Sequence, residues 1–310
     1  MSHIYEALQR AEAERKSTTQ ETINHTHTEP EGSYKTDLQP APPPLEAAIA
    51  APVAAPAAKA DPSFLSKVPR RPWSPSFERL PALQKGGVEV EQFRSLRSRV
   101  QEFRDLKSLK SVLISSGLPQ EGKSFIAVNL ALNLARHKSS KVLLIDGDMR
   151  CSSLHQYLGS EFYPGLPDYL SGKASLLEVM QYPEELKDRD PATSAILNNI
   201  AFIPGGEGGD RAADLSSSKR FDELLTTMAP YFDWIIIDSP PVLLVSDAVN
   251  LARSCDAVLL VARSGVTTFP VAQRAQNELK ASNILGFVLN AVDKPSNNGS
   301  YYYRYDSKKE

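Results

Sequence analysis

The chain has few cysteines and histidines, and this scarcity excludes two kinds of site. Cys151 and Cys255 are the only cysteines among 310 residues, too few for a disulfide framework or a cysteine-ligated zinc site. The five histidines are scattered along the sequence and form no metal-binding cluster. We expect Cys151 to be a small buried apolar residue, the commoner role of a free cysteine.

The sequence also lacks long hydrophobic runs and a strong charge of either sign. No apolar stretch approaches the ~18 residues that a membrane-spanning helix needs, and no signal peptide is recognisable. The net charge of −2 comes without a basic stripe, so the sequence gives no case for nucleic-acid binding. We therefore expect a soluble, cytoplasmic chain, and any association with a membrane should come through a partner.

A phosphate-binding loop is the most informative motif that is present. Residues 117–124 read Gly-Leu-Pro-Gln-Glu-Gly-Lys-Ser, which fits the pattern G-x-x-x-x-G-K-[ST] between an apolar run and a helical one. The glycines let backbone N–H groups face phosphate oxygens, Lys123 reaches the β- and γ-phosphates, and the Ser124 hydroxyl is a ligand for Mg²⁺. The candidate nucleotide-binding residues here are Gly117, Leu118, Pro119, Gln120, Glu121, Gly122, Lys123, Ser124 and Phe125.

Two further apolar runs end in aspartates. Residues 142–145 lead into Asp146-Gly-Asp148, and residues 234–237 lead into Asp238-Ser-Pro-Pro. The carboxyl ends of parallel strands line one crevice, so we expect these carboxylates to meet the phosphate loop there. A single Asp after a strand is often only a helix cap, but two such strands beside a phosphate loop indicate an ATP and Mg²⁺ site.

The order of these motifs, followed by a tyrosine cluster, resembles the bacterial tyrosine kinases (BY-kinases), the cytoplasmic kinases of capsule and exopolysaccharide export. The resemblance covers residues 85–310. It implies a tyrosine autokinase in which Lys123 and Mg²⁺ stabilise the transferred phosphoryl group, while Asp146 orients the incoming hydroxyl as its base. It further implies that Asp148 and Asp238 organise the Mg²⁺ shell.

The resemblance suggests roles for residues outside these motifs. Asn290 corresponds to an adenine-side residue, although a simple turn asparagine explains it equally well. Glu91, Arg94 and Arg97 match an E-x-x-R-x-x-R oligomerisation element, whereas charges at this spacing usually form a solvated helix face. The implied partners are further copies of the chain, in a homo-oligomer such as a ring, a membrane-embedded polysaccharide co-polymerase or chain-length regulator as activator, and a cognate tyrosine phosphatase.

The C-terminal tail carries the candidate phosphoacceptors Tyr301, Tyr302, Tyr303 and Tyr305. Residues 294–299 have linker chemistry, so we expect residues 294–310 to form a flexible tail. The resemblance implies that a neighbouring subunit phosphorylates this tail, and a sticky interaction tail without phosphorylation is the alternative. Each phosphate adds roughly 1.5–2 negative charges and opposes docking into an acidic site, so multiple phosphorylation should loosen the oligomer.

Apolar runs alternate with amphipathic stretches, which predicts an α/β fold of the phosphate-loop NTPase class: a mostly parallel, doubly wound sheet with helices on both faces. We expect strands near 111–116, 141–146, 200–204, 233–238, 256–262 and 284–290. We expect helices near 89–107, 122–137, 153–158, 174–181, 217–229, 246–254 and 270–281, with mobile loops at 183–198 and 205–217. The kinase domain should span 85–293, after a Pro/Ala-rich disordered linker at 17–84 and a short amphipathic helix at 1–16.

Departures from the kinase pattern leave two other functions open. Gln120 stands where the family usually has Gly and needs a conformation open to a residue with a Cβ, and Phe125 stands where Thr is common. A regulatory ATPase of the partitioning and division-site type shares this sheet, but its signature is an additional Lys where this chain has Leu118. An ATP-binding pseudokinase scaffold would act by assembly alone, and tail phosphorylation would separate it from an active kinase.

Overall fold

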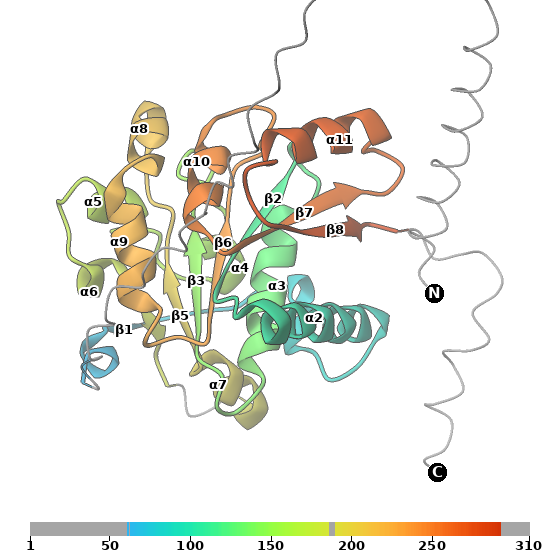
Figure 1. The fold of residues 1–310 in the computed structure, drawn as a ribbon. Coiled ribbons are helices and arrows are strands. Elements are labelled where there is room, and N and C mark those ends of the chain that lie inside the picture. The colour runs from blue at the N-terminus through green and yellow to red at the C-terminus, as the bar shows by residue number, and fades with distance from the viewer. Residues whose placement is uncertain (1–60, 62, 186–189, 293–310) are drawn as a thin grey trace, which may run out of the picture. The chain divides into compact units, whose positions relative to one another are not determined.

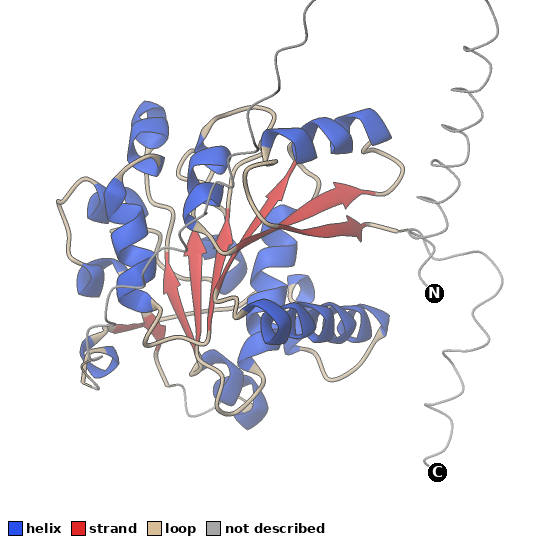
Figure 2. Cartoon of the chain, viewed as in Figure 1, coloured by secondary structure: helices blue, strands red, loops and turns tan. Residues whose placement is uncertain are grey.

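A six-stranded parallel sheet forms the centre of the computed structural model, which describes residues 61, 63–185 and 190–292. The strand order is β5-β3-β6-β2-β7-β8 (Figures 1 and 2). The strands are β2 (Ser111–Ser116), β3 (Val142–Asp146), β5 (Ile200–Ile203), β6 (Trp234–Asp238), β7 (Ala257–Arg263) and β8 (Ile284–Asn290). Every pairing between them is parallel. The predicted fold class and its six strands are confirmed.

Helices cover both faces of this sheet (Figure 2). One face packs against α5 (Leu166–Leu170), α6 (Leu176–Val179), α8 (Ala212–Ser216), α9 (Lys219–Met228), α10 (Asp247–Ser254) and α11 (Phe269–Glu278). The other face packs against α2 (Val88–Lys107), α3 (Lys123–Ala135), α4 (Leu154–Leu158) and α7 (Pro191–Leu197). This arrangement explains why β2, β3 and β6 are buried along their whole length, because a strand covered on both sides needs apolar residues on both.

Several segments between the strands differ from the expectation. The predicted loop at 183–198 contains α7, and the one at 205–217 contains the 3₁₀ turn η4 (Gly209–Arg211) and α8. The helix expected at 174–181 is only α6, after which the short strand β4 (Tyr182–Pro183) begins. These helices have four to seven residues, too short to form in isolation. Tertiary packing therefore creates them, and local sequence periodicity does not reveal them.

The folded domain begins upstream of the predicted boundary at residue 85. Residues 63–84, assigned to the linker from their composition, contain the 3₁₀ turns η1 (Leu65–Lys67), η2 (Phe77–Arg79) and η3 (Pro81–Leu83) and the strand β1 (Arg70–Arg71), which pairs with β4. Trp73 and Leu80 are buried in the core. The side chain of Arg136, just after α3, donates to the carbonyls of Ala82 and Gln84. A few large apolar side chains are enough to dock this segment, although prolines dominate its average composition.

The predictions for the helix at 1–16, for most of the linker, and for the tail at 294–310 lie outside the described residues. Within the described part of the chain, no helix is both long and apolar enough to cross a membrane.

Candidate functional site

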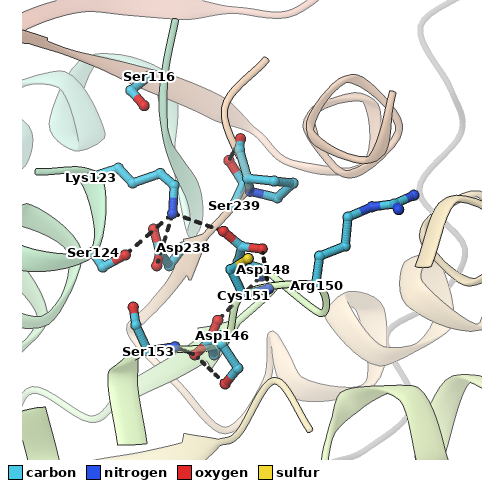
Figure 3. A network of polar contacts seen from close by, with 12 residues as sticks. Ser116, Lys123, Ser124, Asp146, Asp148, Arg150, Cys151, Ser153, Asp238 and Ser239 are labelled. Atoms are coloured by element: carbon cyan, nitrogen blue, oxygen red, sulfur yellow. Dashed lines mark hydrogen bonds and ion pairs between the residues drawn. The ribbon is translucent and has the colours of Figure 1, made fainter. Parts of the chain in front are cut away.

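The candidate site lies where β2, β3 and β6 end side by side. Asp146 on β3 is in register with Asp238 on β6, and Ile114 on β2 is paired with the same Asp238. The phosphate loop leaves β2 at this edge and enters α3 at Lys123. Figure 3 shows Lys123, Ser124, Asp148 and Asp238 pointing toward one another. The meeting of these side chains, expected from three separate motifs, is a geometric fact of the sheet.

The phosphate loop is fixed by contacts that its pattern does not include. The Glu121 side chain is buried, and its Oε2 accepts the Leu118 N–H at 2.7 Å. Its other oxygen accepts a hydrogen bond from the Thr267 hydroxyl, in the turn between β7 and α11. Gln120 adopts a φ of 62°, a left-handed conformation that is unfavourable for a residue with a Cβ. The loop is therefore held in shape by a buried carboxylate and a residue from another segment.

Asn290 braces the same loop from the end of β8. Its Nδ2 donates to the Glu121 carbonyl at 2.9 Å. A Cβ on Gly122 would lie 2.0 Å from this Nδ2, and Gly122 has a φ of 97°. Glycine is required there for both its conformation and its lack of a side chain. The adenine-side role of Asn290 stays a prediction, but its position beside the phosphate loop excludes an isolated turn residue.

Lys123 sits between two carboxylates. Its Nζ donates to Asp148 Oδ2 at 2.9 Å and lies 3.9 Å from Asp238 Oδ2. It also lies 3.4 Å from Ser124 Oγ. Burial opposes its positive charge, but the carboxylates of Asp238 and Asp148 outweigh that effect and raise the pKa of Lys123. The ammonium group is thus charged at any physiological pH.

Of the charged groups in this site, Asp238 has the least favourable electrostatic environment. It has no solvent-accessible surface, and its oxygens make no hydrogen bond of standard length and angle within the described residues, although Lys123 and Ser124 lie near enough to favour its charged form. Burial raises the pKa of Asp238 to about 7, with Lys123 opposing the shift and Asp146 adding to it. A buried carboxylate that lacks hydrogen bonds of standard geometry is a fitting ligand for a hard cation.

Asp146 is placed differently from the other two aspartates. Its Oδ2 accepts hydrogen bonds from Ser152 Oγ at 2.9 Å and from the N–H groups of Ser153 and Leu154 at 3.0 Å. Its Oδ1 accepts the Asp148 N–H at 3.2 Å. Burial raises the pKa of Asp146 even though these hydrogen bonds favour its charged form. The carboxylate therefore caps α4, which is the alternative role that a single Asp after a strand often has.

The residues that follow the second aspartate also differ from expectation. Cys151 is exposed, so its prediction as a buried residue is wrong, because the turn after β3 carries its side chain outward. Its N–H donates to Asp148 Oδ1 at 3.0 Å. Arg150 forms a two-pronged ion pair with the buried Asp247, at 2.8 Å and 3.3 Å. Asp247 begins α10 and was missed, although an Asp at the start of an amphipathic stretch was a usable signal.

The E-x-x-R-x-x-R residues lie on α2, away from this site. Glu91 and Arg94 form an ion pair with each other, and Arg97 donates to the carbonyl of Asn133 on α3 at 3.4 Å. Their role in oligomerisation stays a prediction. The candidate phosphoacceptors Tyr301, Tyr302, Tyr303 and Tyr305 lie outside the described residues.

Comparisons with known proteins identify the family. A sequence profile of an AAA domain matches residues 120–269. Tyrosine-protein kinase CpsD of Streptococcus pneumoniae serotype 4 is 34% identical over 206 residues, which are 66% of this chain and 84% of that protein. Tyrosine-protein kinase YwqD of Bacillus subtilis is 35% identical over 70% of this chain and 86% of that protein. The chain belongs to the bacterial tyrosine kinases.

Solved structures of BY-kinases share this fold. The kinase domain of the Escherichia coli tyrosine kinase ETK matches with a TM-score of 0.60 and 30% identity, over 67% of this chain and 78% of that one. Other BY-kinases are much longer: the chain spans only 27% of tyrosine-protein kinase ptk of Acinetobacter johnsonii, with 31% identity. Membership in this kinase family implies that the chain binds a nucleotide.

Proposed function

We propose that this BY-kinase transfers the γ-phosphate of ATP to tyrosine hydroxyls, with its own tail tyrosines as substrates, and thereby regulates capsule or exopolysaccharide synthesis and export. The convergence of Lys123, Asp148 and Asp238 at one edge of the sheet carries the proposal. Family membership supports the choice of tyrosine, and the cluster at Tyr301–Tyr305 supplies an acceptor.

The donor set fits a Mg²⁺ ion bound with ATP. Mg²⁺ prefers oxygen ligands and is usually held by one or two carboxylates together with substrate phosphates. Ser124, Asp148 and Asp238 would supply such oxygens, and neither oxygen of Asp238 makes a hydrogen bond of standard geometry within the described residues. When bound, the ion would neutralise charge on the transferred phosphoryl group. Lys123 would add positive charge at the β- and γ-phosphates, and the N–H groups of residues 117–124 would hold them.

The proton of the incoming tyrosine hydroxyl does not need a strong base. Phosphoryl transfer has a loose transition state, so the tyrosine hydroxyl needs orientation more than early deprotonation. For Asp146 to act as the proposed base, the incoming hydroxyl would have to replace one of its present donors. Ser152 Oγ is the donor that can rotate away without breaking main-chain structure. Asp148, which is 3% exposed, stays committed to Lys123 and the metal.

Partners follow from the proposed substrate. A tail that is phosphorylated by a neighbouring subunit requires a homo-oligomer, for which Glu91, Arg94 and Arg97 on α2 are the candidate contacts. We propose that a membrane-embedded co-polymerase recruits the chain to the inner face of the plasma membrane and activates it, and that a cognate tyrosine phosphatase reverses the modification. The phosphates repel the acidic site, so extensive phosphorylation should loosen the oligomer.

The decisive experiment is intact-mass analysis of the purified full chain with Mg-ATP. We expect stepwise gains in mass that are absent from Lys123→Met and from a variant with Tyr301, Tyr302, Tyr303 and Tyr305 changed to Phe. A gain that persists in the Phe variant would move the acceptors elsewhere in the chain. Nucleotide binding without any gain, even with the cytosolic segment of the membrane partner added, would favour a regulatory ATPase or a pseudokinase scaffold.

A further inference from the structure

Residues 70–79, which we call the strap, lie beside α4, the helix that follows β3. The Ser74 N–H donates to the Gly159 carbonyl, and the Ser76 N–H donates to the Tyr157 carbonyl, both at 3.0 Å. The guanidinium group of Arg79 lies over the Tyr157 ring, 4.1 Å from its centroid. All of these contacts reach the C-terminal end of α4. They attach a segment upstream of the domain to an element of the site.

The strap is itself firmly held by the edge of the domain. Trp73 is 2% exposed, and its Nε1 donates to Gln181 Oε1 at 3.0 Å. The edge of its ring meets Phe202 on β5, with centroids 6.1 Å apart. Arg71 adds an ion pair with Glu161. Because the large Trp73 side chain is buried and hydrogen-bonded here, the strap can act as a rigid support.

The opposite end of α4 is attached to Asp146. Three donors from Ser152, Ser153 and Leu154 converge on Asp146 Oδ2. A helix of five residues is ~7.5 Å long and does not form in isolation. Its position therefore depends on its two end attachments and on the burial of Leu154 and Leu158. The short helix α4 therefore connects the carboxylate of Asp146 to the strap.

We propose that the strap is a positioning element of the active site: by fixing the C-terminal end of α4, it fixes the donors that hold Asp146 and the turn that presents Asp148. The phosphate loop and Asp238 come from β2 and β6, whereas the strap contacts described above reach α4, β5, Glu161 and Gln181. Displacing the strap should therefore lower turnover while nucleotide binding persists. The turnover argument rests on the proposed kinase function, whereas the structural coupling does not.

The first test displaces the strap from the α4 side. Gly159 has a φ of 59°, and a Cβ there would lie 2.0 Å from the Ser74 carbonyl oxygen, so Gly159→Ala expels the strap. Gly172→Ala is the matched control, because Gly172 has a similar φ of 78° but its nearest neighbour, Arg220 Nη1, is 3.8 Å from the added Cβ. Both variants carry the backbone strain of a left-handed alanine. Only the first also breaks the strap contact.

A second variant acts from the strap side, in case Gly159→Ala does not fold. Ser76 has a φ of −79°, which proline accepts. Ser76→Pro removes the N–H that donates to Tyr157 and places the ring Cδ against that carbonyl, so it breaks the contact while α4 keeps its own sequence. Ser76→Ala keeps that N–H and is its control. Each full-length protein is assayed for tail phosphorylation, for the KM of ATP, and for hydrogen exchange in peptides covering 152–158 and, as a reference, α9.

We expect Gly159→Ala and Ser76→Pro to lower kcat by about tenfold or more, since small misplacement of catalytic groups is costly, with the KM of ATP changed less than about twofold. Exchange should rise in 152–158, where the amides bonded to Asp146 lie, and stay unchanged in α9, which packs on the opposite face of the sheet. Unchanged exchange in 152–158, or equal effects in the two controls, would overturn the proposal. If the wild-type chain forms no phosphotyrosine, the proposed function fails, and the exchange comparison still decides whether the strap holds Asp146.

Discussion

Replacing Asp238 with Asn should stabilise the nucleotide-free protein, and more so at high pH. Asp238 is fully buried, and its pKa is raised from 3.8 to about 7. In the unfolded chain it is already charged at pH 6, whereas in the folded protein it still holds its proton. The folded protein must give up that proton as the pH rises through 7. Stability from this group is therefore present at low pH and lost toward pH 8.

The size of the effect follows from the same pKa. With a folded pKa of about 7, the folded protein loses ~1.4 kcal/mol of unfolding free energy between pH 6 and pH 8 through this group. For a domain of this size, that corresponds to a fall in Tm of roughly 3–6 °C. The Asn variant carries no proton to lose and escapes this fall. The raised pKa of Lys123 lies above this pH range and does not contribute to the difference.

The assay is thermal unfolding of wild type and Asp238→Asn without nucleotide at pH 6 and pH 8. Asp105→Asn, on the exposed surface of α2, controls for the loss of one negative charge. The Tm advantage of Asp238→Asn should grow between the two pH values, and that of Asp105→Asn should not. Equal advantages at pH 6 and pH 8 would refute the argument that burial of this carboxylate costs stability. Mg-ADP should then raise the Tm of wild type but not of Asp238→Asn, because ligand binding stabilises by mass action.

Two further predictions concern residues that brace the site. Glu121→Ala should raise the KM of ATP by about tenfold, the equivalent of ~1.4 kcal/mol for an orphaned Leu118 N–H. Glu121→Gln, which still offers an acceptor, should restore most of the affinity, and Thr267→Val should weaken it less than Glu121→Ala; equal KM values for Gln and Ala would contradict this reasoning. Asp247→Asn should lower kcat more than it raises the KM of ATP, since Arg150 would lose its buried charged partner. The charge swap Arg150→Asp with Asp247→Arg should recover part of the lost kcat. A swap no better than either single change would show that the pair does not position the turn after β3.

The sheet could be predicted because its strands are short apolar runs covered on both faces. Residues 142–146 and 234–238 are buried at every position, and such runs bounded by turns are typical of parallel strands. Strand order then brings the carboxyl ends of β2, β3 and β6 together. The meeting of Lys123, Asp148 and Asp238 thus follows from sequence pattern and topology alone.

Contacts between distant segments could not be predicted in the same way. Arg150 and Asp247 are 97 residues apart, and Glu121 and Thr267 are 146 apart. The capping of α4 by Asp146 depends on a turn that returns to the carboxylate six to eight residues later. Propensities and periodicity describe neighbours along the chain, so they carry no information on these pairs. For the same reason, the Pro/Ala-rich composition of residues 17–84 did not reveal that Trp73 packs into the core.

Several residues of this site carry conformational or electrostatic costs that an ordinary part of a fold avoids. Gln120 adopts a left-handed conformation, which costs ~1–2 kcal/mol for a residue with a Cβ. Asp238 is fully buried with no hydrogen bond of standard geometry, and Lys123, whose side chain is 12% exposed, lies between Asp148 and Asp238. Such costs persist only where the rest of the structure compensates, and here two apolar cores, one on each face of the sheet, do so. A metal ion bound with the nucleotide would neutralise the buried carboxylate of Asp238. Binding of the nucleotide and its metal should therefore stabilise the folded protein.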